Sequence, residues 1–182
     1  MRLRSLHPLL GTAGVALALA LGAIAGTNAR AGTVAGPAGT VFCPFSATEL
    51  SVIVGRKLQR SALGGGRVAG QCAFSAVEAG KAVAPQIYLT RDPGNAADLR
   101  NSYVYYVAAR SQLAGRPQVK SRPELGPGAF TLSVPDAHVT NAFFLSGDNI
   151  ATLSIDLSNS SSTRPERLVV AQILALAAKR IT

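Results

Sequence analysis

Several stretches of the chain show alternating apolar and polar residues, which is the two-residue period of a β-strand. The clearest covers residues 138–157, where Val139, Ala142 or Phe143, and Leu145 lead into the turn-forming sequence Ser146-Gly147-Asp148-Asn149. After the turn, one set of alternate residues is Ile150, Thr152, Ser154 and Asp156, and the other is Ala151, Leu153, Ile155 and Leu157. This pattern predicts a β-hairpin with one buried face. Weaker alternation predicts further strands at 57–80 around a Gly64-Gly65-Gly66 turn, at 84–93, and at 116–134 around a bend at 125–128.

The first of three predicted helices follows Ser46. Ser46 and Glu49 match a capping box, in which each side chain accepts a hydrogen bond from a free backbone N–H at the start of a helix. The apolar residues that follow have helical spacing up to Val54. Gly55 is suited to the left-handed conformation that ends many helices, so we expect a short helix between these two signals.

The second predicted helix follows the turn Asp92-Pro93-Gly94. It is expected to begin at Gly94 or Asn95, to run to about Ala114 and to end at Gly115. Its apolar stripe consists of Leu99, Tyr103, Tyr106, Val107 and Leu113. Together with Tyr105, the stripe residues Tyr103 and Tyr106 form a tyrosine cluster that could either pack in the core or stack on a ligand. A helical stripe with phenols at its edge favours packing in the core, because tyrosine buries its ring and leaves its hydroxyl in water.

The third predicted helix closes the chain. Thr163 and Glu166 match a second capping box, and Pro165 would lie in the first turn, where its missing N–H has no cost. Residues 168–181 are apolar on most sides, which predicts a well-buried helix. Together, the strands and helices predict an α+β fold, a single domain in which an antiparallel sheet packs against two or three helices.

The N-terminal 31 residues have the pattern of a cleavable signal peptide. Arg2 and Arg4 precede an apolar, uncharged run at 9–26, and Ala29 and Ala31 form an Ala-x-Ala site. We expect cleavage between Ala31 and Gly32. A retained membrane anchor is the alternative, since the run is about as long as a membrane-spanning helix. A flexible leader is then expected at 32–42, and the folded domain at 43–182.

The charge of the chain changes with cleavage. Removal of Arg2, Arg4 and Arg30 lowers the formal net charge from +9 to +6. The remaining basic residues are scattered and few aromatic residues lie among them, so a nucleic-acid partner is not expected. A mild positive charge outside the cytoplasm is compatible with anionic envelope polymers or lipid head groups, and also with a charge that serves solubility alone.

The chain has only two cysteines, Cys43 and Cys72. Cys43 lies too far beyond the apolar run at 9–26 to carry a lipid anchor. A catalytic thiol would need a nearby base, and after cleavage His138 is the single histidine of the chain. Because the chain is expected to be exported and has two cysteines, we favour a disulfide between them.

The chain contains none of the G-x-S-x-G, S-x-x-K, H-E-x-x-H or C-x-x-C motifs of common catalytic or metal sites. Asp136 and His138 would point to one face if they lay on a strand, but two ligands are too few for a zinc site. A catalytic triad could only use His138. We therefore predict no catalytic residues, no metal site and no cofactor, and expect the triple glycine to form a turn rather than a phosphate-binding loop.

The segments "CPFSATELSVIVG", "GQCAF", "PELGPGAF" and "FFLSGDNIATLSID", followed by an Ala-rich final helix, resemble a group of actinobacterial exported domains of unknown function, many of them lipoproteins. The resemblance covers residues 43–181. It implies the Cys43–Cys72 disulfide and an α+β layer of antiparallel sheet and helices, and it implies no catalytic residue. The lipid-anchoring cysteine of the lipoproteins is absent here.

These observations predict an exported, non-enzymatic domain of the cell envelope or the secreted fraction. We expect it to bind a small ligand, a lipid or an envelope partner, with no stable membrane anchor after cleavage. A concave apolar sheet face would support this prediction. The alternatives are a protein-interaction or sensor-like module, which would show an exposed apolar patch, and an envelope hydrolase that uses His138.

Overall fold

The hairpin predicted at 138–157 forms the centre of an antiparallel sheet. The computed structural model describes residues 43–60, 72–158 and 164–181, all of which belong to one compact unit, Pro37–Thr182. Within these residues the sheet has seven strands in the order β1-β2-β3-β7-β6-β5-β4, and every neighbouring pair is antiparallel. The strands are β1 (Gln59–Arg60), β2 (Cys72–Glu78), β3 (Lys81–Pro93), β4 (Gln118–Ser121), β5 (Phe130–Val134), β6 (Val139–Leu145) and β7 (Asn149–Asp156).

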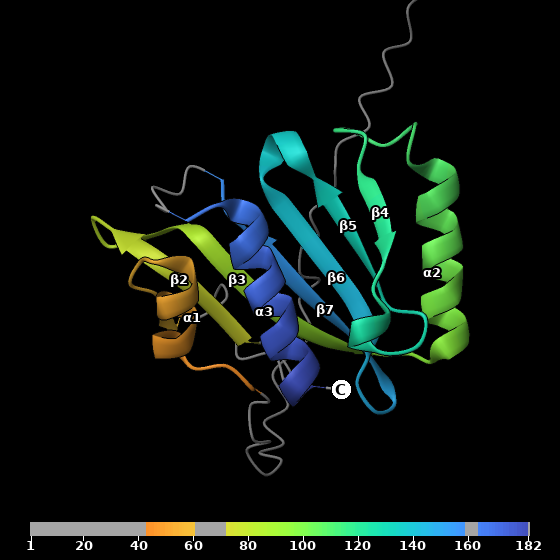
Figure 1. Ribbon diagram of the computed structural model, residues 1–182, viewed down its shortest axis with the longest axis horizontal. Helices are drawn as coiled ribbons and strands as arrows, with labels where there is room; N and C mark the ends of the chain where they lie inside the picture. The colour runs from red at the N-terminus through yellow and green to blue at the C-terminus, as the bar shows by residue number, and fades with distance from the viewer. Residues whose placement is uncertain (1–42, 61–71, 159–163, 182) are drawn as a thin grey trace, which may run out of the picture. The chain divides into compact units, whose positions relative to one another are not determined.

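Helices lie on both faces of the sheet. The described helices are α1 (Ala47–Val54), α2 (Ala96–Ala109) and α3 (Glu166–Arg180), with two short 3-10 helices, η1 (Pro123–Leu125) and η2 (Pro135–Ala137). Figure 1 shows α1 and α3 side by side over one face of the sheet. On β6, Phe144 belongs to the core beneath these two helices, whereas its neighbour Phe143 contacts Tyr106 of α2. Successive strand residues point to opposite faces, so α2 lies on the other face. The predicted α+β fold is confirmed.

The main core lies between the sheet and the pair α1 and α3. Leu50 and Val54 of α1 are fully buried, as are Val169 and Ile173 of α3. The sheet contributes Cys72, Phe74, Ala76, Ile87, Leu89, Ala142, Phe144, Ala151, Leu153 and Ile155 to the same cluster. These are alternate residues of each strand. On β7 they belong to one of the two sets that the sequence pattern separates, whereas on β6 Ala142 and Phe144 are buried and Val139 and Leu145 are only partly buried.

A smaller aromatic cluster lies between α2 and the other face of the sheet. The Phe130 and Phe143 rings stack with centroids 4.8 Å apart, and Tyr103 meets Phe130 edge-on at 5.5 Å. Tyr106 lies 6.0 Å from Phe130 and 5.8 Å from Phe143. Packing is therefore confirmed for Tyr103 and Tyr106. Tyr105 leans on Tyr106 but remains 60% exposed.

The start of the described chain follows its sequence signals closely. Both hydrogen bonds of the Ser46–Glu49 capping box are present, and Gly55 ends α1 with φ of 75°. The Cys43–Cys72 disulfide is formed and joins the segment ahead of α1 to the first residue of β2. The loop that it closes has a sequence separation of 29 residues.

The predicted boundaries of β3 and α2 were wrong in three places. The strand expected at 84–93 begins earlier, at Lys81. Asp92 and Pro93 end β3 in pairing with β7 instead of forming a turn. The helix expected to reach Ala114 ends at Ala109, because the next residues form tighter turns in which Gln112 N–H donates to the carbonyl of Ala109. Three-residue turns of this kind commonly end α-helices.

The start of α3 also differs from the prediction. Pro165 is the N-cap and no side chain caps the helix, so Glu166 is its first residue rather than the third residue of a capping box. The helix is buried along one stripe only, and Leu168 is 52% exposed. The expectation of a helix buried on most sides was wrong, because α3 covers the sheet on one side and faces outward on the other.

Several predictions fall outside the described residues. They are the signal peptide with its Ala31–Gly32 cleavage site, the leader at 32–42, the Gly64-Gly65-Gly66 turn and the role of Thr163. None of the helices in the described part of the chain is long and apolar enough to cross a membrane.

Candidate functional site

The outward side chains in the middle of β3 and β7 are polar. Ile87 and Leu89 of β3, and Leu153 and Ile155 of β7, point into the core beneath α3. Because strand side chains alternate between faces, their neighbours point to the face on which α2 lies. We call the following seven residues the polar face: Gln86, Tyr88 and Thr90 of β3, Asn141 of β6, and Thr152, Ser154 and Asp156 of β7. All seven are partly exposed, and α2 packs mainly on β4 and β6.

The register of the sheet arranges these residues in rows across the strands. Tyr88 is the cross-strand partner of Ser154, and Ser154 is the partner of Asn141. Gln86 pairs with Asp156 in a row on one side, and Thr90 pairs with Thr152 on the other. Directly opposed residues lie about 5 Å apart at Cβ. The polar face therefore offers hydroxyl, amide, phenol and carboxylate groups at regular short intervals.

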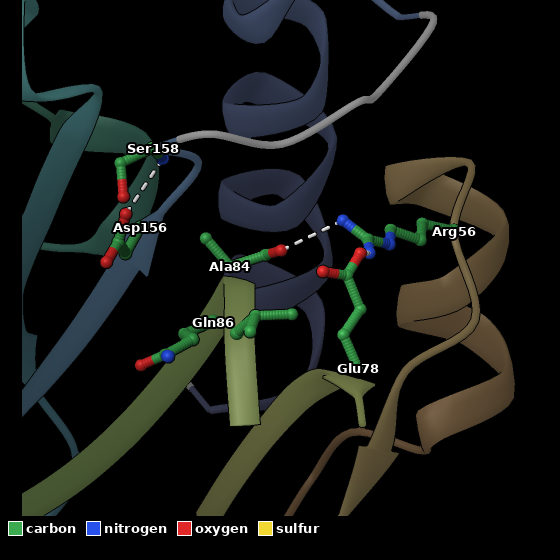
Figure 2. Close-up of a pocket in the computed structure, with 7 residues that line it drawn as sticks. Arg56, Glu78, Ala84, Gln86, Asp156 and Ser158 are labelled. Atoms are coloured by element: carbon green, nitrogen blue, oxygen red, sulfur yellow. Dashed lines mark hydrogen bonds and ion pairs between the residues drawn. The ribbon is translucent and has the colours of Figure 1, made fainter. Parts of the chain in front are cut away.

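A pocket of about 300 Å³ lies at one end of the polar face. Figure 2 shows its lining residues, which are Arg56, Glu78, Val83, Ala84, Gln86, Asp156 and Ser158. Gln86 and Asp156 belong both to the pocket and to the polar face. A ligand that lies along the strands could therefore place one end in this pocket.

Arg56 and Glu78 form one side of the pocket and neutralise each other. The Arg56 guanidinium makes an ion pair with Glu78, and its Nη1 donates to the carbonyl of Ala84 at 3.1 Å. This carbonyl is available because the register shift between Ser75 and Ala76 leaves Ala84 without a partner in β2. The irregularity in the sheet thus positions the arginine.

Asp156 and its neighbours form the other side of the pocket. The backbone N–H of Ser158 donates to Asp156 Oδ1 at 2.8 Å. The Tyr88 hydroxyl donates to Gln86 Oε1, which leaves the amide N–H groups of Gln86 as donors. Partial burial of Tyr88, followed by the negative charge of Asp156, raises the pKa of the Tyr88 phenol, so this hydroxyl remains protonated and able to donate.

His138 does not line this pocket and has an acidic partner. Its Nδ1 is 2.7 Å from Glu166 Oε2, and its side chain is 54% exposed. Asp136 does not share a strand face with it, because both residues are exposed and precede β6. Pro135 begins the 3-10 helix η2, and His138 follows with φ of 54°, so β6 starts only at Val139. Within the described residues, no three His, Cys, Asp or Glu side chains gather in a way that could hold a metal.

Only part of the polar face could be predicted from the sequence. The alternation at 150–157 predicted which residues of β7 are buried, and Thr152, Ser154 and Asp156 were identified as the opposite set. The pocket was missed. Arg56 and Glu78 are 22 residues apart in the chain and meet only because of the sheet irregularity, for which the sequence carries no local signal.

Comparison of the chain with protein-family models, with curated proteins and with solved structures finds no match. The resemblance to actinobacterial exported domains therefore stays a prediction. The polar face and its pocket are the features of the described residues that bear most directly on function.

Proposed function

We propose that the protein is an exported, non-enzymatic domain that binds a glycan of the cell envelope on its polar face. The observation that carries this proposal is the row of partners Tyr88, Ser154 and Asn141, continued on either side by further polar side chains. Each of these positions is outward-facing and partly exposed. The proposal keeps the predicted class of an envelope-binding domain and narrows the predicted ligand from a small molecule, lipid or envelope partner to a glycan.

The chemistry of the polar face suits a sugar. A sugar hydroxyl both donates and accepts a hydrogen bond, so its binding site needs both kinds of group close together. Serine, threonine and tyrosine hydroxyls provide both functions, Asn141 and Gln86 add amide donors and acceptors, and Asp156 adds a strong acceptor. An extended chain of sugars could contact several rows of the sheet at once.

A lipid ligand is less well supported. Lipid binding would need a concave apolar surface, which was the expectation for the sheet face beyond the helices. The outward residues of β3 and β7 between Gln86 and Thr90, and between Thr152 and Asp156, are instead polar. The apolar rings on this face, those of Phe130 and Phe143, are packed against α2.

Export of the domain is supported by two observations. The N-terminal residues match a signal peptide, and the Cys43–Cys72 disulfide is of the kind that persists in oxidising compartments. Envelope glycans lie outside the cytoplasm, where such a domain would meet them. We therefore propose the cell envelope, or the medium close to it, as its location.

The proposal is tested with the mature chain by affinity electrophoresis in gels that contain one soluble polysaccharide each. The set comprises a glucan, a mannan, an arabinan, a galactan and glycol chitin, a soluble N-acetylated polymer. Retardation by at least one is expected. The triple variant Tyr88→Phe, Ser154→Ala and Asn141→Ala removes one polar group per strand from the central row. Because each hydrogen bond contributes about 0.5–1.5 kcal/mol, affinity should fall by about tenfold or more.

The matched control removes three polar side chains from the outer surfaces of the three helices. It combines Thr48→Ala on α1, Asn101→Ala on α2 and Gln172→Ala on α3, all of which are exposed. This control should bind as the wild type does. The proposal is overturned if none of the polysaccharides retards the wild type, or if both triple variants lose the same affinity.

A further inference from the structure

The charges that line the pocket are not balanced. Arg56 is paired with Glu78, so this side of the pocket is neutral. Asp156 accepts a hydrogen bond from the backbone of Ser158, but none of the ion pairs within the described residues involves its carboxylate. The pocket therefore carries one uncompensated negative charge, although the whole chain has a formal net charge of +9.

The described neighbours of Asp156 do not neutralise this charge. Its cross-strand neighbours are Gln86 on β3 and Val139 on β6, neither of which is charged. Figure 2 shows the Arg56 guanidinium on the other side of the pocket, turned toward Glu78 and the carbonyl of Ala84. The nearby His138 ring is hydrogen-bonded to Glu166. Within the described residues, these neighbours supply no positive charge to the carboxylate, which can therefore pair with a cationic group of a ligand.

We infer that this pocket binds the protonated amine of an amino sugar and so selects among the glycans that the polar face can hold. This inference rests on the proposed function. The ammonium group would donate to the Asp156 carboxylate in a charge-assisted hydrogen bond. The amide N–H groups of Gln86 and the hydroxyl of Ser158 would serve the neighbouring sugar hydroxyls.

The size of the pocket agrees with one sugar unit. Its volume of about 300 Å³ lies at the lower end of the range for small-molecule sites, which is about 300–1,000 Å³. The following units of the glycan would lie along the polar face.

A divalent cation is a poorer occupant of the pocket, because calcium takes six to eight oxygen ligands and Asp156 is the single unpaired carboxylate that lines the pocket. An acidic sugar would be repelled by the same carboxylate.

The test compares three oligosaccharides of equal length by calorimetry, at mildly acidic pH where the sugar amine is protonated. They are glucosamine oligomers, N-acetylglucosamine oligomers and galacturonate oligomers. The wild type should bind the amine form up to about fivefold more tightly than the acetylated form, as expected for a solvent-accessible ion pair, and the acidic form most weakly. Asp156→Asn should remove the preference for the amine while binding of the acetylated form persists.

Asp92→Asn is the matched control. Asp92 has the same outward orientation near the opposite end of β3 and does not line the pocket, so its loss changes the net charge equally. It should keep the preference for the amine. The inference is overturned, and the proposed function stands, if the wild type binds the amine and acetylated forms equally or if both variants lose the preference alike. Absence of binding to these oligomers and to every polysaccharide of the first assay overturns the proposed function itself.

Discussion

Reduction of the Cys43–Cys72 disulfide should destabilise the domain by about 3.5 kcal/mol. The bond closes a loop with a sequence separation of 29 residues. In the chain-entropy model, a cross-link of this span lowers the entropy of the unfolded chain by about 12 cal/mol/K, which gives that free energy at room temperature. The bond also holds the segment ahead of α1, whose Leu50 and Val54 are completely buried beneath the sheet.

Urea unfolding of the oxidised and the reduced protein measures this effect directly, because both forms contain the same atoms in the core apart from the thiol hydrogens. The reduced protein should have a lower midpoint and a larger dependence of the unfolding free energy on urea, since its unfolded state is less constrained. Cys43→Ala with Cys72→Ala should show a similar loss, and reducing agent should then have no further effect. A loss below about 1 kcal/mol would contradict the assignment of this bond as a main constraint on the unfolded chain.

Two further predictions concern side chains outside the polar face. Hydrogen bonds from the Arg180 side chain, and then from Ser46, lower the pKa of Glu49 from 4.5 to about 2. A lowered pKa stabilises the fold above pH 4.5, and this contribution is lost as the pH falls toward 2. Melting temperatures of Glu49→Gln should therefore fall less steeply across that window than those of the wild type, and parallel curves would refute the assignment. The His138→Asn variant should bind glycan as the wild type does, since asparagine tolerates the left-handed backbone conformation at this position. Release of sugar fragments by the wild type but not by this variant would instead establish the hydrolase alternative.

The parts of the fold that the sequence predicted well are those in which local signals and tertiary packing agree. At 150–157 the two-residue alternation coincides with burial of Ala151, Leu153 and Ile155 in the main core. At Ser46 the capping box requires only residues within one helical turn. Signals of this kind need no knowledge of the rest of the structure.

The parts that failed depend on contacts between distant residues. Glu166 was expected to cap α3, but its carboxylate contacts His138, 28 residues earlier in the chain. The pocket depends on Arg56 reaching Glu78 and Ala84, which follows from the register shift in β2 and β3. A single sequence carries no periodic signal for contacts between residues so far apart. The only part of the candidate site that could be predicted is therefore the set of outward polar residues on β7.

The most direct test of the proposed glycan site is a nuclear magnetic resonance titration of the isotope-labelled mature protein with the polysaccharide fragment that retards it most. The largest shifts in backbone amide signals should fall at the outward positions of β3, β6 and β7, centred on Tyr88, Ser154 and Asn141, and should extend to Asp156. Shifts concentrated instead on α1 and α3, with the signals of the polar face unchanged, would contradict the central claim.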